Sequence, residues 1–186
     1  MNHLKIVAVG PTACGKTYVC NFLSEAIEQT ANDYRPTVGV RILEYEINMP
    51  VREKPCKLDI ELWDLSGDKK YESCWPAIFK SANGVLLVYN PNVAEHSGDI
   101  QDWYTITTKN TDLKEVYFCV ICNDKSSGKD RDVVRLPANL ERLTRVTCCL
   151  ADQGEKFRDE FGKFLTKIIT SHMEANEQEE LKILNA

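Results

Sequence analysis

Hydrophobic and polar positions follow two different periods along this 186-residue chain. Continuous apolar runs, which are typical of buried parallel strands, occupy residues 4–9, 85–89 and 116–122. Apolar residues recur at helical spacing over about residues 16–29, 100–110 and 155–168. Strands that alternate with helices predict βαβ units and a mainly parallel sheet, so the expected fold class is α/β.

Two further runs alternate between apolar and polar residues on either side of a turn region at Met49–Pro55. In the second run, three apolar residues fall on one face (Leu58, Ile60 and Leu62), while acidic residues point the other way. Half-exposed runs of this kind predict an antiparallel pair at an edge of the sheet.

The C-terminal part predicts a last strand at Arg145–Leu150 and a final helix that begins at a capping-box-like Asp152–Glu155. Residues 171–186 are acidic and have little apolar surface to bury, so we expect a mobile tail there. The sequence therefore predicts one domain over residues 1–170 and a tail over residues 171–186.

Composition is that of an ordinary soluble globular protein, with 43% hydrophobic and 27% charged residues. The net charge of -5 argues against nucleic-acid binding, which favours a basic face. No apolar run approaches about 18 residues, so no transmembrane segment is expected. The chain enters a strand at once and ends without a cysteine box, which predicts a cytoplasmic protein with no signal peptide and no lipid anchor.

The eight cysteines are scattered, mostly inside apolar patterns. Cys119 and Cys122 have zinc-like spacing, but positions i and i+3 of a strand point to opposite faces. A tetrahedral site would also need a second ligand pair, for which the adjacent Cys148 and Cys149 are poorly suited. We therefore expect reduced, buried thiols rather than a disulfide scaffold or a zinc site.

The strongest motif is Gly10–Thr17, which fits the phosphate-binding pattern G-x-x-x-x-G-K-[ST]. It lies between an apolar strand and a helical pattern, the context that this motif requires. Gly10 and Gly15 allow the backbone to curl so that N–H groups point at a polyphosphate, and the dipole of the following helix adds positive potential. Lys16 supplies a charge to the outer phosphates, and the Thr17 hydroxyl can ligate Mg²⁺.

Two further motifs narrow the class of phosphate-loop protein. Asp64-Leu-Ser-Gly67 fits the D-x-x-G of GTPases, in which Asp64 holds Mg²⁺ through water and the Gly67 N–H meets a γ-phosphate. Thr37 lies in a polar loop just before a strand, where a second Mg²⁺-ligating hydroxyl is expected. Taken alone, Asp64 could be a strand-end turn residue and Thr37 a plain loop hydroxyl.

Together and in this order, the motifs resemble those of Ras-like small GTPases. Residues 39–45 and 61–77 are similar in particular to the Rab-like protein five family, the small-GTPase subunit of the intraflagellar transport B complex. The resemblance implies a Ras-like P-loop fold, with a mostly parallel six-stranded sheet, one antiparallel edge strand and helices on both faces. It also implies GTP or GDP with Mg²⁺ as cofactors, other B-complex subunits (a coiled-coil pair) as partners, and a place at the cilium or flagellum and its basal body.

The resemblance also assigns the site residues. Metal contacts fall to Thr17, Thr37 and, through water, Asp64. Nucleotide contacts fall to Gly10, Thr12, Ala13, Cys14, Gly15, Lys16, Thr17, Tyr18, Tyr34, Thr37, Gly67, Asn123, Asp124, Lys125 and Ala151.

One departure from this family concerns hydrolysis. Hydrolysing relatives carry, after D-x-x-G, a glutamine that orients the attacking water, and this chain carries Asp68. A carboxylate aimed at the γ-phosphate would be repelled by on the order of 4 kcal/mol per charge pair at about 4 Å, or it would turn away and leave the water unpositioned. Both outcomes predict slow hydrolysis, and no residue is assigned a certain catalytic role. The alternative is that Asp68 acts as a general base.

A second departure concerns the base. Relatives carry N-K-x-D, whereas this chain reads Asn123-Asp124-Lys125-Ser126, so a serine replaces the aspartate that accepts two hydrogen bonds from guanine. A lost bidentate contact removes about 1–3 kcal/mol of discrimination, which predicts weak guanine preference unless Asp124 or another group substitutes. We favour the interpretation of Asp124 as a solvated turn residue. The Ala151 N–H remains able to meet a base carbonyl.

Four functions fit these motifs: a GTP-binding adaptor with negligible hydrolysis, a cycling GTPase, a small-molecule kinase, and a pseudo-GTPase that needs no nucleotide. The chain lacks an evident lid or an arginine-rich second-substrate region for a kinase, and the intact phosphate and metal motifs count against a pseudo-GTPase. We favour the adaptor. Trp63, Tyr71 and Trp75, around the expected second switch, are either core residues or a partner-binding patch.

Overall fold

The computed structural model describes residues 3–26, 35–124, 136–148 and 150–184, with the side chains of residues 150–152 and 184 excepted. Its six strands form one sheet in the order β2-β3-β1-β4-β5-β6. β2 pairs antiparallel with β3, and the other pairs are parallel, which confirms the predicted sheet with one antiparallel edge strand. The strands are β1 (His3–Val9), β2 (Val40–Val51), β3 (Lys54–Leu65), β4 (Gly84–Tyr89), β5 (Phe118–Asn123) and β6 (Thr144–Cys148).

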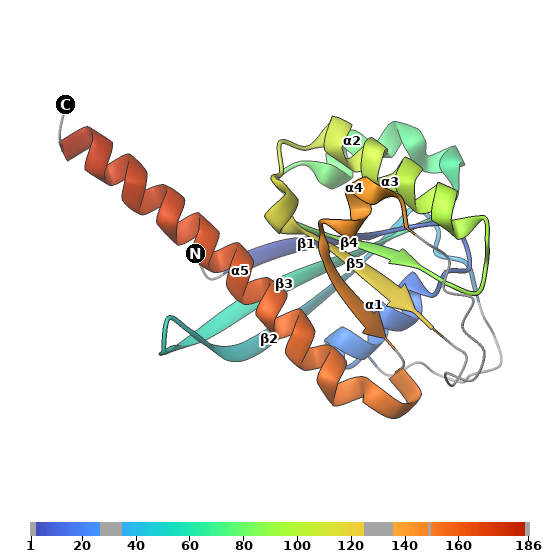
Figure 1. Ribbon diagram of the computed structural model, residues 1–186, viewed down its shortest axis with the longest axis horizontal. Helices are drawn as coiled ribbons and strands as arrows, with labels where there is room; N and C mark the ends of the chain where they lie inside the picture. The colour runs from blue at the N-terminus through green and yellow to red at the C-terminus, as the bar shows by residue number, and fades with distance from the viewer. Residues whose placement is uncertain (1–2, 27–34, 125–135, 149, 185–186) are drawn as a thin grey trace.

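Helices lie on both faces of the sheet, as expected for the predicted fold (Figure 1). One face packs against α1 (Lys16–Ser24) and α5 (Leu150–Leu184). The other packs against α2 (Trp75–Phe79), α3 (His96–Asn110) and α4 (Ala138–Glu141). Two short 3-10 helices, η1 (Lys69–Cys74) and η2 (Glu115–Tyr117), precede α2 and β5.

Burial follows the hydrophobic pattern closely. Every residue of β4 and β5 is buried, because both strands have neighbours on either side and helices on both faces. On β3, Leu58, Ile60 and Leu62 are buried under α1 and α5, while the acidic residues between them point the other way. Along β2, positions 41–49 alternate between half-buried and exposed, as an edge strand with one covered face requires.

The predicted burial of the cysteines holds in part. Cys119 and Cys122 lie in the cores on opposite faces of the sheet. The described part of the chain contains no cluster of His, Cys, Asp and Glu suited to a metal, and the absence of a zinc site stays a prediction. Five of the seven described cysteines are buried and all seven are free. The expectation of burial is wrong for Cys74, which is exposed on η1, and only half met by Cys56. Cys149 lies outside the described residues.

Several predicted boundaries are wrong for local reasons. The first helix ends at Ser24 rather than near residue 29, because Glu25 adopts a left-handed conformation (φ 55°). The strand expected from residue 116 begins at Phe118, since residues 115–117 form η2. The helix expected from residue 100 begins at residue 96, and the last strand covers residues 144–148 rather than 145–150.

Trp75, one of the aromatic residues around the expected second switch, is a core residue. Trp75 is 2% exposed and its ring packs against Trp103 with centroids 4.9 Å apart. Trp63 and Tyr71 are only half-buried. Of the two interpretations left open by the sequence, core residue or partner-binding patch, the first therefore applies fully to Trp75 alone.

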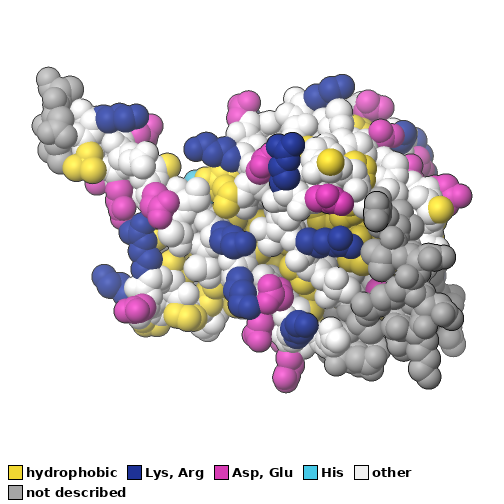
Figure 2. Space-filling model, viewed as in Figure 1, with side chains coloured by type: hydrophobic (Ala, Val, Ile, Leu, Met, Phe, Trp, Pro, Cys, Tyr) yellow, Lys and Arg dark blue, Asp and Glu magenta, His cyan; other side chains and the backbone are white. Residues whose placement is uncertain are grey.

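α5 continues well past residue 170, with one interruption at Gln153 (φ -135°, ψ 30°). Residues 174–183 are exposed, and this end of the helix stands clear of the body at the left of Figures 1 and 2. Arg52, at the tip of the β2–β3 hairpin, pairs with Glu177 at 2.6 Å. The domain boundary at residue 170 and the mobility of the tail stay predictions. None of the described helices is both long and apolar enough to cross a membrane.

Candidate functional site

The phosphate loop between β1 and α1 has the backbone that its glycines predict. Gly10 and Gly15 have φ values of 149° and 92°. A Cβ atom at Gly10 would lie 2.0 Å from the Val88 carbonyl oxygen, so β4 leaves room only for glycine. Ala13 also has a positive φ of 59°, which the sequence pattern does not indicate because alanine seldom adopts it. The loop therefore holds three residues with positive φ, at positions 10, 13 and 15, directly before a helix N-terminus.

Lys16 closes this loop on itself. Its Nζ atom donates to the carbonyl oxygens of Gly10 (2.9 Å) and Pro11 (2.7 Å), and the side chain is buried. The Cys14 Sγ atom lies 3.7 Å from the same ammonium group. Burial raises the pKa of the Cys14 thiol, an effect that the neighbouring Lys16 charge only partly offsets, so Cys14 is a packing residue rather than a nucleophile.

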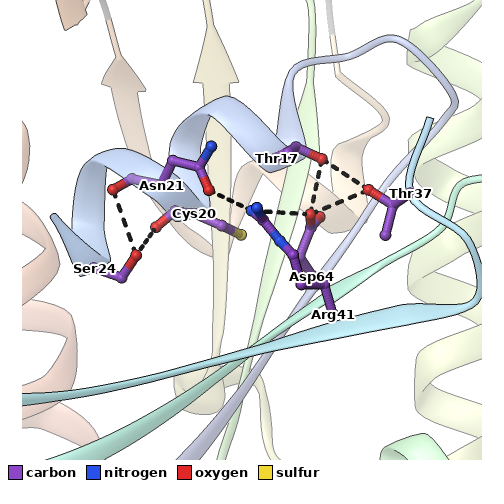
Figure 3. Close-up of polar contacts among 7 residues, drawn as sticks. All are labelled: Thr17, Cys20, Asn21, Ser24, Thr37, Arg41 and Asp64. Carbon is purple, nitrogen blue, oxygen red and sulfur yellow. Dashed lines mark hydrogen bonds and ion pairs between the residues drawn. The ribbon is translucent and has the colours of Figure 1, made fainter. Parts of the chain in front are cut away.

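Three predicted metal residues come together beside the loop (Figure 3). Thr17 Oγ1, at the start of α1, donates to Asp64 Oδ2 over 2.8 Å. Thr37 Oγ1, just before β2, lies 3.2 Å from the same oxygen and 2.9 Å from Thr17 Oγ1. Three segments far apart in the sequence thus converge on one carboxylate at the end of β3.

Asp64 is fully buried, and its second oxygen, Oδ1, has no hydrogen-bond partner among the described residues. Burial raises the pKa of Asp64 above its ordinary value, while the Thr17 hydrogen bond and the charge of Arg41 oppose that rise. Arg41 lies near Oδ2 alone, and a buried carboxylate oxygen without a partner is costly, so Oδ1 is available to a further cation. Two hydroxyls and a carboxylate are oxygen ligands of the kind that Mg²⁺ prefers, so these residues fit that ion.

Sequence reasoning missed Arg41. Its Nη2 atom lies 3.6 Å from Asp64 Oδ2 and also donates to Asn21 on α1, as Figure 3 shows. Arg41 is on the inward-facing register of β2, where Leu43 and Tyr45 are half-buried. The only signal in the sequence was that Arg41 occupies a position of the alternating run at which the following residues, Leu43 and Tyr45, are apolar.

Gly67 lies against the phosphate loop, as its predicted role requires. A Cβ atom there would lie 2.6 Å from the Thr12 nitrogen and 2.8 Å from the Pro11 carbonyl carbon. The next residue, Asp68, caps η1 instead: its carboxylate accepts from the Lys70 backbone N–H (3.0 Å) and pairs with Lys70 Nζ (2.7 Å). These hydrogen bonds hold the pKa of Asp68 below its ordinary value.

The loop that the sequence predicts to contact the base follows β5. Asn123 is buried and its Nδ2 atom donates to the Cys14 carbonyl (2.9 Å), so it ties this loop to the phosphate loop. The alternative of a solvated turn residue is wrong for Asp124: it is buried, its N–H donates to the Cys148 carbonyl (3.0 Å), and its Oδ1 atom accepts from Asn92 Nδ2 (3.0 Å). Asn92 lies 32 residues earlier, beyond the reach of sequence pattern.

The remaining predicted contacts are less informative. Thr12 and Ala13 are exposed at the top of the phosphate loop, and Tyr18 is 47% exposed on α1. Tyr34 and Lys125 lie outside the described residues. Ala151 is in the first turn of α5, and its side chain is among those not described.

Comparison with known proteins agrees with this geometry. A family model described as "Roc: Ras of Complex, Roc, domain of DAPkinase" matches residues 5–126. The "Intraflagellar transport protein 22 homolog" of Danio rerio is 41% identical over 186 residues, which cover 99% of this chain and 100% of that protein. The Homo sapiens homolog is 39% identical over the same shares.

Two solved structures are also similar. The "T. brucei IFT22/74/81 GTP-bound crystal structure" gives a TM-score of 0.79 at 26% identity, covering 94% of this chain and 99% of that one. The "T. brucei IFT22 GDP-bound crystal structure" gives a TM-score of 0.70 at 24% identity, covering 92% and 99%, and that likeness shows the fold alone.

Proposed function

This chain belongs to the intraflagellar transport protein 22 family of Ras-like small GTPases, and from that premise we propose that it is a GTP-binding adaptor subunit of the transport machinery of cilia and flagella. The adaptor binds GTP with Mg²⁺, hydrolyses it slowly, and presents a switch surface to a coiled-coil pair of transport subunits. The IFT22/74/81 assembly of the T. brucei relative supports a partner of that kind.

The observation that carries the proposal is the convergence on Asp64. Thr17 and Thr37 lie within 3.2 Å of one Asp64 oxygen, and the other oxygen is buried with no hydrogen-bond partner among the described residues. Mg²⁺ would supply positive charge at the phosphates of the nucleotide. Thr17 and Thr37 would hold it directly and Asp64 through water. Because Thr37 belongs to the segment before β2, filling this site couples the nucleotide to the outer surface of the sheet.

Lys16 and the loop amides would bind the phosphates themselves. The Lys16 ammonium donates to two carbonyls of the phosphate loop, so it lies inside that loop. The Gly67 backbone touches the loop from the other side, which supports contact of its N–H with the γ-phosphate.

Slow hydrolysis is supported by the contacts of Asp68. Both of its oxygens are used by Lys70, in a cap of η1. A carboxylate held in this way neither orients a water as a glutamine amide would nor serves readily as a base, because hydrogen bonds to the ionised form lower its proton affinity.

Weakened guanine preference is supported by the contacts of Asp124. The residue that would have to replace the missing aspartate is buried and bonded to Asn92. A carboxylate already engaged within the protein gains less from a base, so the discrimination of about 1–3 kcal/mol that relatives obtain there is not recovered.

The deciding experiment is to denature the purified protein and chromatograph the nucleotide that it releases. Stoichiometric, intact GTP supports a tightly binding, slowly hydrolysing adaptor. GDP would instead indicate a cycling GTPase, and ATP would show that guanine selectivity has been lost entirely. Absence of nucleotide, together with no binding of added Mg²⁺–GTP by calorimetry, would overturn the proposal in favour of a pseudo-GTPase.

A further inference from the structure

Arg41 lies directly opposite Asp64 in the antiparallel pair of β2 and β3. Directly opposed side chains have Cβ atoms roughly 4.5–5.5 Å apart, so the strand register itself brings the two charges together. Leu43 and Tyr45, which follow on the same face of β2, are half-buried against the apolar core beneath α1 and α5. An arginine at the end of such a face needs polar partners for its guanidinium group.

The guanidinium group of Arg41 joins three elements of the fold. Its Nη2 atom lies 3.6 Å from Asp64 Oδ2 at the end of β3 and also donates to Asn21 Oδ1 on α1 (Figure 3). Asn21 is buried, and Asp64 is fully buried. Arginine carries its donors in a rigid fork, so this one side chain holds the carboxylate of β3 against the amide of α1.

Arg41 is the only cation of the described residues that forms an ion pair with Asp64. Lys16, the lysine of the phosphate loop, donates instead to two loop carbonyl oxygens. The other groups on Asp64 Oδ2 are the hydroxyls of Thr17 and Thr37, which are neutral. Among the described contacts of Asp64, Arg41 alone therefore carries a charge that offsets the carboxylate.

The sheet holds Arg41 in place independently of Thr37. Thr37 reaches Asp64 from the residues before β2, whereas Arg41 is part of the β2–β3 ladder. The Ser66 N–H donates to the Gly39 carbonyl (2.8 Å), which continues the pairing of the two segments beyond the start of β2. Arg41 therefore stays beside Asp64 in any arrangement of Thr37 that leaves this ladder intact.

A cross-strand ion pair could serve the sheet alone, since opposite charges on directly opposed residues stabilise strand pairing. Two observations favour a role in the site as well. Arg41 contacts the same Asp64 oxygen as the two threonines that are expected to hold Mg²⁺. The other oxygen, Oδ1, is buried with no hydrogen-bond partner among the described residues. A group that contacts a metal-holding carboxylate orients it and tunes its charge.

The charge of Arg41 has two opposite consequences at this site. An ionised carboxylate repels the phosphates of a nucleotide, and a cation beside the carboxylate offsets that repulsion. The same cation also repels a divalent metal ion that approaches the carboxylate. Because the fold fixes Arg41, it acts on nucleotide binding with the metal and without it, and its effect is larger without it.

We propose that Arg41 is a positioning residue, a built-in counter-ion of Asp64 that lets the protein retain GTP with less dependence on Mg²⁺ than the carboxylate alone would impose. The inference rests on the proposed binding of GTP and adds a residue that sets how strongly metal and nucleotide are coupled. By linkage, the factor by which Mg²⁺ tightens GTP binding equals the factor by which GTP tightens Mg²⁺ binding, so one substitution changes both.

The test is the dissociation constant of fluorescent N-methylanthraniloyl-GTP, measured for the full-length protein with saturating Mg²⁺ and again with excess EDTA. The constant in EDTA divided by the constant in Mg²⁺ measures the coupling. For Arg41→Gln we expect this ratio to be about tenfold larger than for the wild type, because loss of the counter-ion weakens binding most when no metal replaces its charge.

Two further variants separate charge from structure. Arg41→Lys keeps a positive charge without the fork and should recover most of the wild-type ratio. The matched control is Arg52→Gln, which removes the same charge from the exposed tip of the β2–β3 hairpin, where Arg52 pairs with Glu177. Its ratio should equal that of the wild type.

A role in the sheet alone would lower the melting temperature of Arg41→Gln and weaken binding by the same factor in both conditions. An unchanged or smaller ratio would therefore overturn the inference while leaving GTP binding intact. If Arg41→Gln does not fold, Arg41→Met, which keeps a straight apolar side chain, is measured in its place with the same expectation. Failure of the wild type to bind the analogue with Mg²⁺ would overturn the proposed function and the inference with it.

Discussion

At the phosphate end of the candidate site, hydroxyls from two segments converge on one buried carboxylate, and a lysine is held inside the loop by two carbonyls. At the base end, the one carboxylate that could read a purine is bonded to Asn92, and Asn123 is bonded to the phosphate loop. The first end has polar groups in place for a ligand, whereas the second uses its polar groups to hold the protein together.

The difference suggests how the two ends contribute to binding. Charge-assisted hydrogen bonds to phosphate and metal are the strong ones, so a complete phosphate end can hold a nucleotide tightly whatever its base. Discrimination between bases requires groups that are left unpaired by the wrong base. A protein whose base end discriminates weakly would still bind GTP tightly through its phosphate end, and its nucleotide would serve as a structural part.

The most damaging change at the phosphate end should be Gly10→Ala. Its Cβ atom would meet the Val88 carbonyl oxygen at 2.0 Å, and its φ is unfavourable for alanine, so we expect a loss of about 3 kcal/mol in unfolding free energy together with nucleotide binding. Gly98→Ala is the matched control, since no described residue beyond the backbone of its own helix lies within 4 Å of the added atom. Equal melting temperatures for the two variants would contradict the close approach of β4 to the loop.

Lys16→Ala should leave the fold intact and weaken GTP binding by about 100-fold, because a charged donor to the outer phosphates is lost. ATP binding should fall by the same factor, since the lysine does not meet the base. Lys109→Ala, at an exposed position of α3, controls for net charge. A loss confined to GTP would mean that Lys16 acts on base recognition, and the division between the two ends would then be wrong.

How far the sequence predicts this site follows the same division. Gly10, Lys16, Thr17 and Asp64 lie in contiguous motifs whose spacing is fixed by the backbone that binds phosphate, and each proved to be where the motif implies. Thr37 was predicted from its place in a loop before a strand, and it does reach Asp64. Contacts within such motifs can be predicted from the sequence because the spacing of the motif residues fixes their geometry.

The contacts that could not be predicted join residues distant in sequence. Asn92 meets Asp124 across two strands, and Lys5 covers Trp63 across the β1–β3 pair. Nothing in the local pattern around Asp124 separates a solvated carboxylate from a buried, bonded one. Whether Asp124 is solvated or buried depends on which loop the order of the strands places beside it, and that order is a property of the whole fold.

At the base end, Ser126→Asp should restore the missing acceptor. We expect the ratio of ATP to GTP dissociation constants to rise by about 10- to 100-fold, as a regained bidentate contact would give, with GTP affinity itself changed less. Asp124→Asn serves as the control and should leave the ratio unchanged. If Asp124→Asn lowers the ratio instead, Asp124 does read the base and the base end is more complete than its bond to Asn92 suggests.

Asp64 provides a pH test of the phosphate end. Because burial raises the pKa of Asp64, the folded protein without bound nucleotide holds a proton on this carboxyl group more tightly than the unfolded chain does. The resulting stability is fully present below the ordinary value of 3.8 and is lost as pH rises through the raised pKa. The difference in unfolding free energy between wild type and Asp64→Asn should therefore fall over that interval. With excess Mg²⁺–GTP at neutral pH, the wild type should instead have the higher unfolding free energy of the two proteins.

The control for this titration is Asp102→Asn, at an exposed position of α3. Saturating Mg²⁺–GTP should raise the melting temperature of Asp102→Asn and of the wild type equally. A difference between the wild type and Asp64→Asn that does not change with pH would mean that the carboxylate is not held at an energetic cost, and the fit to a cation would lose its main support.

The smallest effect should come from Asp68→Gln. A glutamine there regains an amide for the attacking water but loses the cap of η1 that Asp68 makes through Lys70, so the segment no longer has a fixed start. We expect single-turnover GTP hydrolysis to rise by no more than about tenfold, since relatives obtain most of their rate from partner-supplied charge. Lys70→Ala, which keeps the carboxylate but removes its ion pair, should leave the rate unchanged. A fall in rate on Asp68→Ala would instead identify Asp68 as a base and make the phosphate end catalytic as well as binding.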